Sequence, residues 1–318
     1  VDNAKVYELE PDLKSKNYGL IRRKGASVIC PRDGQLGASY VDSIIEDNLD
    51  NGIRYVSRAT IMLSYTWGYE VKVIVETLAS KCKMDGRDPK QTYIWICCLC
   101  NNQHRIGSAE QVSFDEFQET FFSTVTGVGR IWSMMSPWHD PQYLKRVWCV
   151  FEIYVANTES GVEAEIIMPR DQEEAMIDSL EDINKLLDVL SKTSIENAEA
   201  SKEEDKRNIL ALVEEKIGFS ELNNRVNVLM RQWIVTNLMK VVDQEEEDDA
   251  EGGSQGDGGE DEEVERSMKL IHARKLFGIG RALDEMGMYE EALKAYGRCR
   301  DIREMLLGKE HEDTGATY

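Results

Sequence analysis

A chain of 318 residues, 42% of them hydrophobic, is long enough for two domains and can form an ordinary globular core. The formal net charge is −21, but about 13 acidic residues and no basic ones lie between Asp243 and Glu265, which leaves roughly −8 elsewhere. An acidic folded part excludes duplex nucleic acid and anionic membranes as main ligands, because both require a basic surface.

The pattern of apolar residues and cysteines predicts a cytoplasmic protein. No apolar run approaches the length of a membrane span, and the N-terminal sequence VDNAKVYELE lacks an export signal. The chain does not begin with Met, so we expect it to be processed or shortened. The cysteines are odd in number and lie mostly in apolar runs, which indicates buried thiols in a reducing compartment. They are Cys30, Cys82, Cys97, Cys98, Cys100, Cys149 and Cys299.

The first 242 residues divide into an extension and an α/β domain. Residues 1–57 carry turn signals such as PRDGQLG and predict an extension that packs on the domain at 58–242. Apolar runs predict buried strands TIMLSY (60–65), TYIWICCL (92–99), RIWSMMS (130–136) and AEIIM (164–168), and a short fifth strand at 193–200. Helices are expected at 69–86, 113–127 and 141–157, the second with Ser113 as N-cap and Glu116 completing a capping box. Alternating strands and helices imply a parallel sheet covered on both faces.

The remainder of the chain is expected to be helical on either side of an acidic linker. Three helices are predicted at 176–190, 203–217 and 220–242, and an extended, disordered linker at 243–266. Residues 267–318 predict a helix–turn–helix. Its spacing is that of a tetratricopeptide (TPR) repeat, carried by Leu276, Gly280, Leu283, Gly287, Tyr289, Ala292 and Tyr296. Because a single repeat cannot cover its own apolar face, we expect further repeats beyond Tyr318.

Three motifs in order carry a resemblance to two related domain families. LSYTWG (63–68) resembles the first-strand motif of Toll-interleukin receptor (TIR) domains and of fungal heterokaryon-incompatibility (HET) domains. WICCLCNNQ (95–103) is similar to the second HET motif, with Cys97 in place of the usual Asp. SPW followed by LKRVWCVFEI (136–153) resembles the third HET motif and the WCxxE segment of plant TIR domains. The resemblance implies a flavodoxin-like sheet of order 2-1-3-4-5. The segment after Leu306 resembles the region between repeats of kinesin light chains.

In such a sheet, ligands bind where the carboxyl ends of strands 1 and 3 diverge. There we expect the helix around Glu152 to line a shared cleft, into which Ser136, Pro137 and Trp138 extend from strand 3. The loop with Asn101, Asn102, Gln103 and His104 is expected to close over it. The predicted cofactor-binding residues are Ser64, Tyr65, Thr66, Trp67, Gly68, Gln103, Trp138 and Trp148.

Glu152 is the predicted catalytic residue. It matches the glutamate with which catalytic TIR domains cleave NAD, and a carboxylate can stabilise the positive charge that develops on the ribose. The alternative is a surface glutamate paired with Lys145 or Arg146. Trp67 and Trp138 either hold a ring between them or cap the sheet end.

Metal and nucleotide-phosphate chemistry have less support. Cys97, Cys98, Cys100 and His104 invite a zinc site, but alternate strand residues point to opposite faces, so buried thiols are favoured. No glycine-rich phosphate loop occurs, which leaves ATP-driven chemistry without support.

Three functions remain open. The first is a signalling adaptor whose TIR/HET-like domain forms homo-oligomers while the TPR groove binds a protein or peptide. The second is an NAD⁺ glycohydrolase (NADase) with NAD as substrate and no required cofactor. The third is a kinesin-light-chain-like cargo adaptor.

Overall fold

The computed structural model describes residues 2–13, 17–45, 49–50, 53–106, 114–158, 161–179, 194–200, 202–251 and 259–317. Two compact units comprise residues Val1–Arg170 with Ser194–Val226, and Asp171–Thr193 with Asn227–Tyr318. The first half of the chain contains α1 (Val6–Leu9), α2 (Leu20–Gly25), α3 (Tyr40–Ser43), β1 (Leu49–Asp50), β2 (Ile53–Arg54), β3 (Ile61–Ser64), α4 (Val71–Met84), β4 (Ile94–Ile96), α5 (Cys97–Cys100), α6 (Gln103–Ile106), α7 (Phe114–Val128), β5 (Arg130–Met134), η1 (Gln142–Lys145) and α8 (Val147–Thr158). The second half contains β6 (Glu163–Ile167), α9 (Arg170–Asp178), η3 (Ile195–Asn197), α11 (Glu203–Lys216), α12 (Phe219–Glu251), α13 (Gly259–Glu285), α14 (Tyr289–Leu307) and α15 (Glu312–Gly315).

The first unit is built on a four-stranded parallel sheet of order β4-β3-β5-β6. The strands coincide with the apolar runs because a strand covered on both faces has no polar side to show. In chain order this arrangement is 2-1-3-4, as expected for the first four strands. The α/β class is therefore confirmed.

Two predicted strands differ from the structure. The second ends at Ile96, and the next four residues, Cys97–Cys100, form the short helix α5. A short apolar run has no periodicity that separates strand from helix, so the sequence did not mark this change. The expected fifth strand is the 3-10 turn η3, followed by a single bridge between Glu199 and Arg146.

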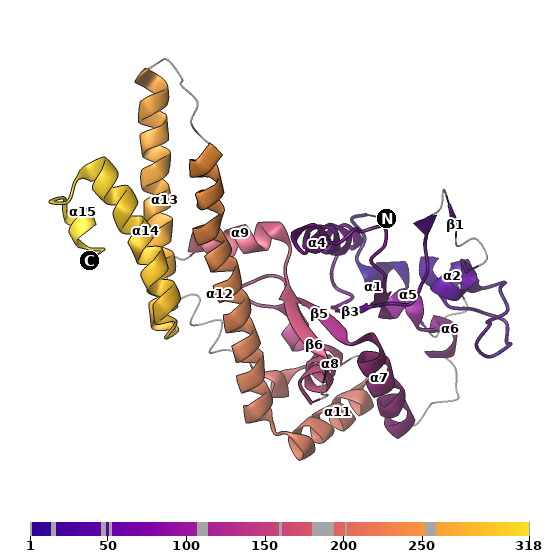
Figure 1. Ribbon diagram of the computed structural model, residues 1–318. Coiled ribbons are helices and arrows are strands. Elements are labelled where there is room, and N and C mark those ends of the chain that lie inside the picture. The colour runs from indigo at the N-terminus through magenta and orange to yellow at the C-terminus, as the bar shows by residue number, and fades with distance from the viewer. Residues whose placement is uncertain are drawn as a thin grey trace. The chain divides into compact units, whose positions relative to one another are not determined.

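Helices cover both faces of the sheet (Figure 1). On one face, Leu63 and Trp132 share an apolar core with Ile74 and Leu78 of α4. On the other face, α7 packs against β3 and β5, and α8 packs against β6. Phe121 of α7 lies 5.1 Å from Phe151 of α8 between ring centroids, which joins these two helices.

The N-terminal segment packs directly on the sheet unit. The backbone N–H of Val6 donates to the Tyr69 carbonyl at 3.2 Å, and the Val6 side chain joins the core. Behind it, Glu10 and Arg22 form a buried ion pair at 2.7 Å. The Arg22 guanidinium also donates to the carbonyls of Asp12 and Leu13. These hydrogen bonds satisfy both buried charges, which a buried ion pair requires.

Helix, rather than extended chain, occupies the described parts of the acidic segment 243–266. α12 continues to Glu251 and α13 begins at Gly259, while residues 252–258 lie outside the described residues. Glutamate is a good helix former, so a helix that starts in packed sequence can extend into such a run. Ser113 and most of the predicted helix 176–190 lie outside the described residues; α9 starts earlier, at Arg170. Each described helix is too short or too polar to cross a bilayer.

α13 and α14 form a helical hairpin that turns at Gly287, where φ is +77°. The Cys299 thiol donates to the Ala273 carbonyl at 3.0 Å, and the rings of Phe277 and Tyr296 lie 5.7 Å apart. Tyr296 lies directly over Gly280: a Cβ added at Gly280 would meet its ring atoms at 2.6 Å. The glycine therefore allows the close approach of the two helices.

We expect Gly280→Ala to destabilise the hairpin by about 1–2 kcal/mol, because the added methyl displaces the Tyr296 ring. The matched control is Gly297→Ala in α14, where an added Cβ meets nothing within 4 Å. That control should stabilise the hairpin by about 0.5–1 kcal/mol, because alanine favours a helix. Hydrogen exchange of the α13 and α14 amides measures both effects. If both substitutions change the stability of the hairpin equally, Tyr296 does not pack closely on Gly280.

Candidate active site

Two serines mark the carboxyl ends of the central strands. Ser64 is the last residue of β3 and pairs in register with Ser133 of β5. Residues in register on neighbouring strands point to the same face, so the two hydroxyls lie together beneath α8. Both side chains are buried. Buried hydroxyls need hydrogen-bond partners, and Tyr143 and Glu152 supply them.

Tyr143 brings a third hydroxyl to the serines. It lies in η1 and is fully buried. Its Oη is 2.6 Å from Ser64 Oγ and 3.2 Å from Ser133 Oγ, and it donates to the Cys149 carbonyl at 3.3 Å. Burial raises the pKa of Tyr143 well above its ordinary value, so the group stays a neutral hydroxyl. The sequence analysis did not identify Tyr143 or Ser133.

Glu152 projects from α8 toward the same edge. Its carboxylate accepts a short hydrogen bond from Ser64 Oγ. The predicted alternative, a surface ion pair, does not form with Lys145, which binds Asp140 at 2.5 Å instead. Within the described residues, no cation lies at ion-pair distance from Glu152. The helix therefore directs this carboxyl toward the end of β3.

The surroundings of Glu152 favour its neutral form. Burial raises its pKa to about 8, and the hydrogen bond from Ser64 opposes that rise. The side chain keeps some solvent contact, although its carboxyl lies among protein atoms. Burial likewise raises the pKa of the Cys97 thiol to about 12 and that of Cys149 well above its ordinary value. Of these neighbouring groups, Glu152 is the one that changes charge near neutral pH.

The loop after β3 holds the predicted cofactor-binding residues close to α5. The Trp67 indole N–H lies 3.3 Å from Cys97 Sγ, and that sulfur lies 3.8 Å from the Tyr65 hydroxyl. Thr66 Oγ1 accepts from the Gly68 amide at 3.3 Å, which fixes the turn. Cys97, where HET domains have Asp, therefore serves as a packing partner of Trp67.

The rings of Trp138 and Trp148 contact other aromatic rings, those of His139 and Phe151. Trp138 is buried and lies edge-on to His139, with centroids 5.6 Å apart. Trp148 lies edge-on to Phe151 at 6.1 Å, and its indole hydrogen-bonds Asp205 of α11. These contacts are those of packing residues. A ring held between Trp67 and Trp138 stays a prediction.

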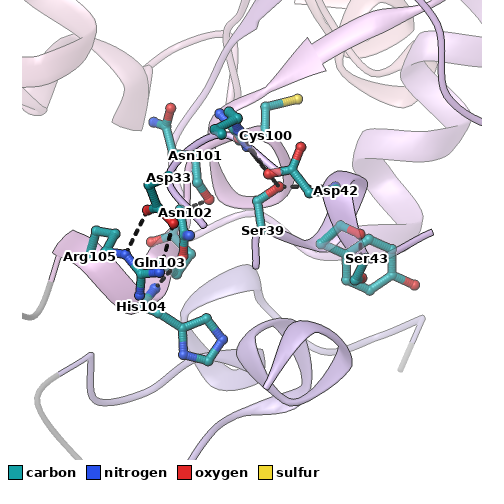
Figure 2. A network of polar contacts seen from close by, with 12 residues as sticks. Asp33, Ser39, Asp42, Ser43, Cys100, Asn101, Asn102, Gln103, His104 and Arg105 are labelled. Carbon is teal, nitrogen blue, oxygen red and sulfur yellow. Dashed lines mark hydrogen bonds and ion pairs between the residues drawn. The ribbon is translucent and has the colours of Figure 1, made fainter. Parts of the chain in front are cut away.

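The loop after β4 is bound to the N-terminal segment, as Figure 2 shows. Asn102 donates to the Gly37 carbonyl at 2.9 Å, and Arg105 pairs with Asp33 at 2.9 Å. His104 Nε2 lies 3.0 Å from the Arg22 carbonyl oxygen. These bonds hold the loop against the N-terminal segment. The prediction that the loop closes over the cleft stays a prediction.

Gln103 faces inward from this loop. Its side chain is buried, and its amide donates to the Cys97 carbonyl at 3.1 Å. Its carbonyl oxygen has no hydrogen-bond partner among the described residues. Arg32 further binds α5 by donating to the Cys100 carbonyl at 2.7 Å. No group of His, Cys, Asp and Glu side chains within the described part of the chain could hold a metal ion.

Replacing Glu152 should change how stability depends on pH. The folded-state pKa of about 8 exceeds the ordinary value of 4.5, so between these values the folded protein keeps a proton that the unfolded chain has lost. Wild-type stability therefore falls as pH rises through this window and stays low above it. We expect Glu152→Gln to be more stable than wild type at pH 9 by on the order of 2 kcal/mol, and about equal at pH 4.

Urea unfolding at pH 4, 7 and 9 measures this difference. The control is Glu119→Gln, an exposed position on α7. If Glu152→Gln and Glu119→Gln follow the same pH dependence, the pKa of Glu152 is not raised.

Comparison of the chain with protein-family models, with curated proteins and with solved structures finds no match.

Proposed function

We propose that the α/β unit is a TIR/HET-like domain that hydrolyses the bond between nicotinamide and ribose in NAD⁺, with Glu152 as its catalytic carboxylate. One observation carries the proposal: the Glu152 carboxyl is directed to the end of β3, bound by Ser64, and unpaired with any cation among the described residues. The strand order β4-β3-β5-β6 supports a TIR-type sheet. The sequence motifs around Ser64 and Glu152 support the same relationship.

The reaction needs one negative group and a water molecule. The bond between C1′ of the ribose and the nicotinamide nitrogen breaks, and its electron pair goes to the ring. Neutral nicotinamide leaves, and positive charge develops on the ribose. Glu152 stabilises that charge, water adds at C1′, and a proton is released with ADP-ribose. Nicotinamide is a good leaving group, so no strong general acid is required.

The raised pKa of Glu152 fits a cationic substrate. In the free protein the carboxyl is largely protonated at pH 7, because its pKa is about 8. A nicotinamide ring with its positive charge nearby favours ionisation and lowers that pKa. Substrate binding would therefore produce the charge that the reaction uses. Ser64 is fully buried and donates to Glu152, which favours a positioning role over that of a nucleophile.

We expect purified protein at high concentration to release nicotinamide from NAD⁺, and Glu152→Gln to lower kcat/KM by roughly 100-fold or more. The pH profile of kcat/KM should rise to a plateau with a midpoint near 8, since it reports the free protein. The midpoint of kcat should be lower, because bound substrate favours the carboxylate.

The control for this assay is again Glu119→Gln, which should retain full activity. Activity that persists in Glu152→Gln would remove Glu152 from the mechanism. A kcat midpoint above that of kcat/KM would contradict the electrostatic argument.

A second candidate function, that of a signalling adaptor, is favoured by the exposed apolar side chains of the helical hairpin. Five large side chains on α13 and α14 are more than half exposed: Met268, Ile271, Tyr289, Leu293 and Met305. Exposed apolar surface on a TPR-like hairpin is typical of protein binding. We propose that this unit binds a protein or peptide and that the α/β unit responds.

Peptides selected from a random library against the full chain should bind through the hairpin. Tyr289→Ser with Leu293→Ser should weaken their binding by roughly tenfold or more, since each substitution removes an exposed apolar contact. The control is Met84→Ser, an exposed apolar residue on α4. Equal binding to all three proteins would exclude the hairpin. Selective binding of a kinesin heavy chain through the same two residues would favour the cargo-adaptor alternative.

A further inference from the structure

We infer that Tyr143 is a positioning residue for Glu152: Tyr143 and Ser64 form a chain of hydroxyl groups that reverses its hydrogen-bond direction when Glu152 gains or loses its proton. The catalytic role of this chain rests on the proposed function. The hydrogen bonds themselves are independent of that function, because Tyr143 Oη lies 2.6 Å from Ser64 Oγ and 3.2 Å from Ser133 Oγ.

The direction of each bond follows from the number of hydrogens available. An ionised carboxylate only accepts, whereas each hydroxyl has one hydrogen to donate. When Glu152 is ionised, Ser64 must donate to it. Ser64 Oγ then accepts from Tyr143, whose single hydrogen is no longer available to its other two acceptors, Ser133 Oγ and the Cys149 carbonyl. Two aligned hydroxyl dipoles thus point their hydrogens toward the negative charge, and each of them stabilises it.

The protonated state is satisfied in the opposite direction. Glu152 then donates to Ser64, and Ser64 donates to Tyr143. Tyr143 in turn donates to the Cys149 carbonyl at 3.3 Å, a group that can only accept. In both states Ser64 and Tyr143 keep hydrogen-bond partners, so the change of charge needs no movement of backbone. A phenylalanine at position 143 could serve neither state.

The groups around Glu152 leave this chain as the source of its stabilisation. From α5 and α8, the thiols of Cys97 and Cys149 face it, and from η1 the Tyr143 hydroxyl does. Burial raises the pKa of each well above its ordinary value, so all three are neutral near pH 8. Arg146 acts on Cys149, and Asp205 of α11 binds Trp148. Hydroxyl dipoles, rather than an ion pair, therefore stabilise the charged form.

Tyr143→Phe tests the inference, because it keeps the buried ring and removes the hydroxyl. Protein labelled with carbon-13 at the glutamate carboxyl is titrated by NMR, with the Glu152 resonance assigned by its loss in Glu152→Gln. We expect the midpoint of Glu152 to rise by about one pH unit, a tenfold change in its ionisation equilibrium. The pH profile of kcat/KM should shift by the same amount, with its plateau largely retained.

Two further variants set the expected order. Ser64→Ala removes the direct donor and should raise the midpoint most, whereas Ser133→Ala removes a competing acceptor of the Tyr143 hydrogen and should not raise it. The matched control is Tyr69→Phe, which deletes another buried hydroxyl, one that bonds backbone groups of Ser136 and Tyr143 and neither of the two serine hydroxyls. Its midpoint should equal that of wild type even if its stability falls.

The outcomes separate this inference from the proposed function. An unchanged midpoint in Tyr143→Phe, or in Ser64→Ala should the first variant not fold, would overturn the hydroxyl chain. A shift as large in Tyr69→Phe would overturn it too, because a general loss of packing would then explain both. A shifted midpoint in a protein that releases no nicotinamide would support the chain and reject NAD⁺ hydrolysis.

Discussion

The Glu152 carboxyl is enclosed by protein atoms and has no counter-ion among the described residues. This constraint determines which groups surround it at the carboxyl end of the sheet. A carboxylate in such a place is costly unless hydrogen bonds stabilise it, and its pKa rises as a result. The strands supply Ser64 and Ser133, which are in register because β3 and β5 are parallel neighbours. η1 supplies Tyr143 between them. The turn before α8 thus completes a site that the sheet alone would leave open.

Much of the sheet and the location of Glu152 follow from the sequence. The runs at 60–65, 130–136 and 164–168 are mostly apolar and are followed by polar or turn residues, so strands buried on both faces were the simplest interpretation. The position of Glu152 beside the end of β3 could be predicted because parallel strands end at a common edge. The prediction needed only the strand order and one helix. The resemblance to TIR and HET domains implied the strand order, and local pattern predicted the helix.

The residues that the sequence did not reveal are those whose partners are distant in the chain. Tyr143 is 79 positions from Ser64, and its neighbours QYLKR resemble the start of an ordinary amphipathic helix. The structure breaks that helix into η1 and α8, which turns the tyrosine toward the sheet. The contacts of the loop after β4 were not predicted for a similar reason. Its partners Asp33 and Gly37 lie in a segment without periodicity, where pattern predicts neither structure nor contacts.

Glu152 lowers the stability of the folded protein at pH values above the ordinary glutamate pKa. Glutamine could occupy the same volume without a charge and would avoid this loss. Under the proposed function, Glu152 takes part in chemistry that requires a negative group only when a positive one arrives. A nicotinamide cation meets this requirement, whereas a neutral dihydronicotinamide offers neither the charge that ionises Glu152 nor a comparable leaving group. The same carboxyl would thus distinguish the oxidised from the reduced dinucleotide. Under this argument, the hydroxyl chain and the substrate act on one equilibrium, the ionisation of Glu152.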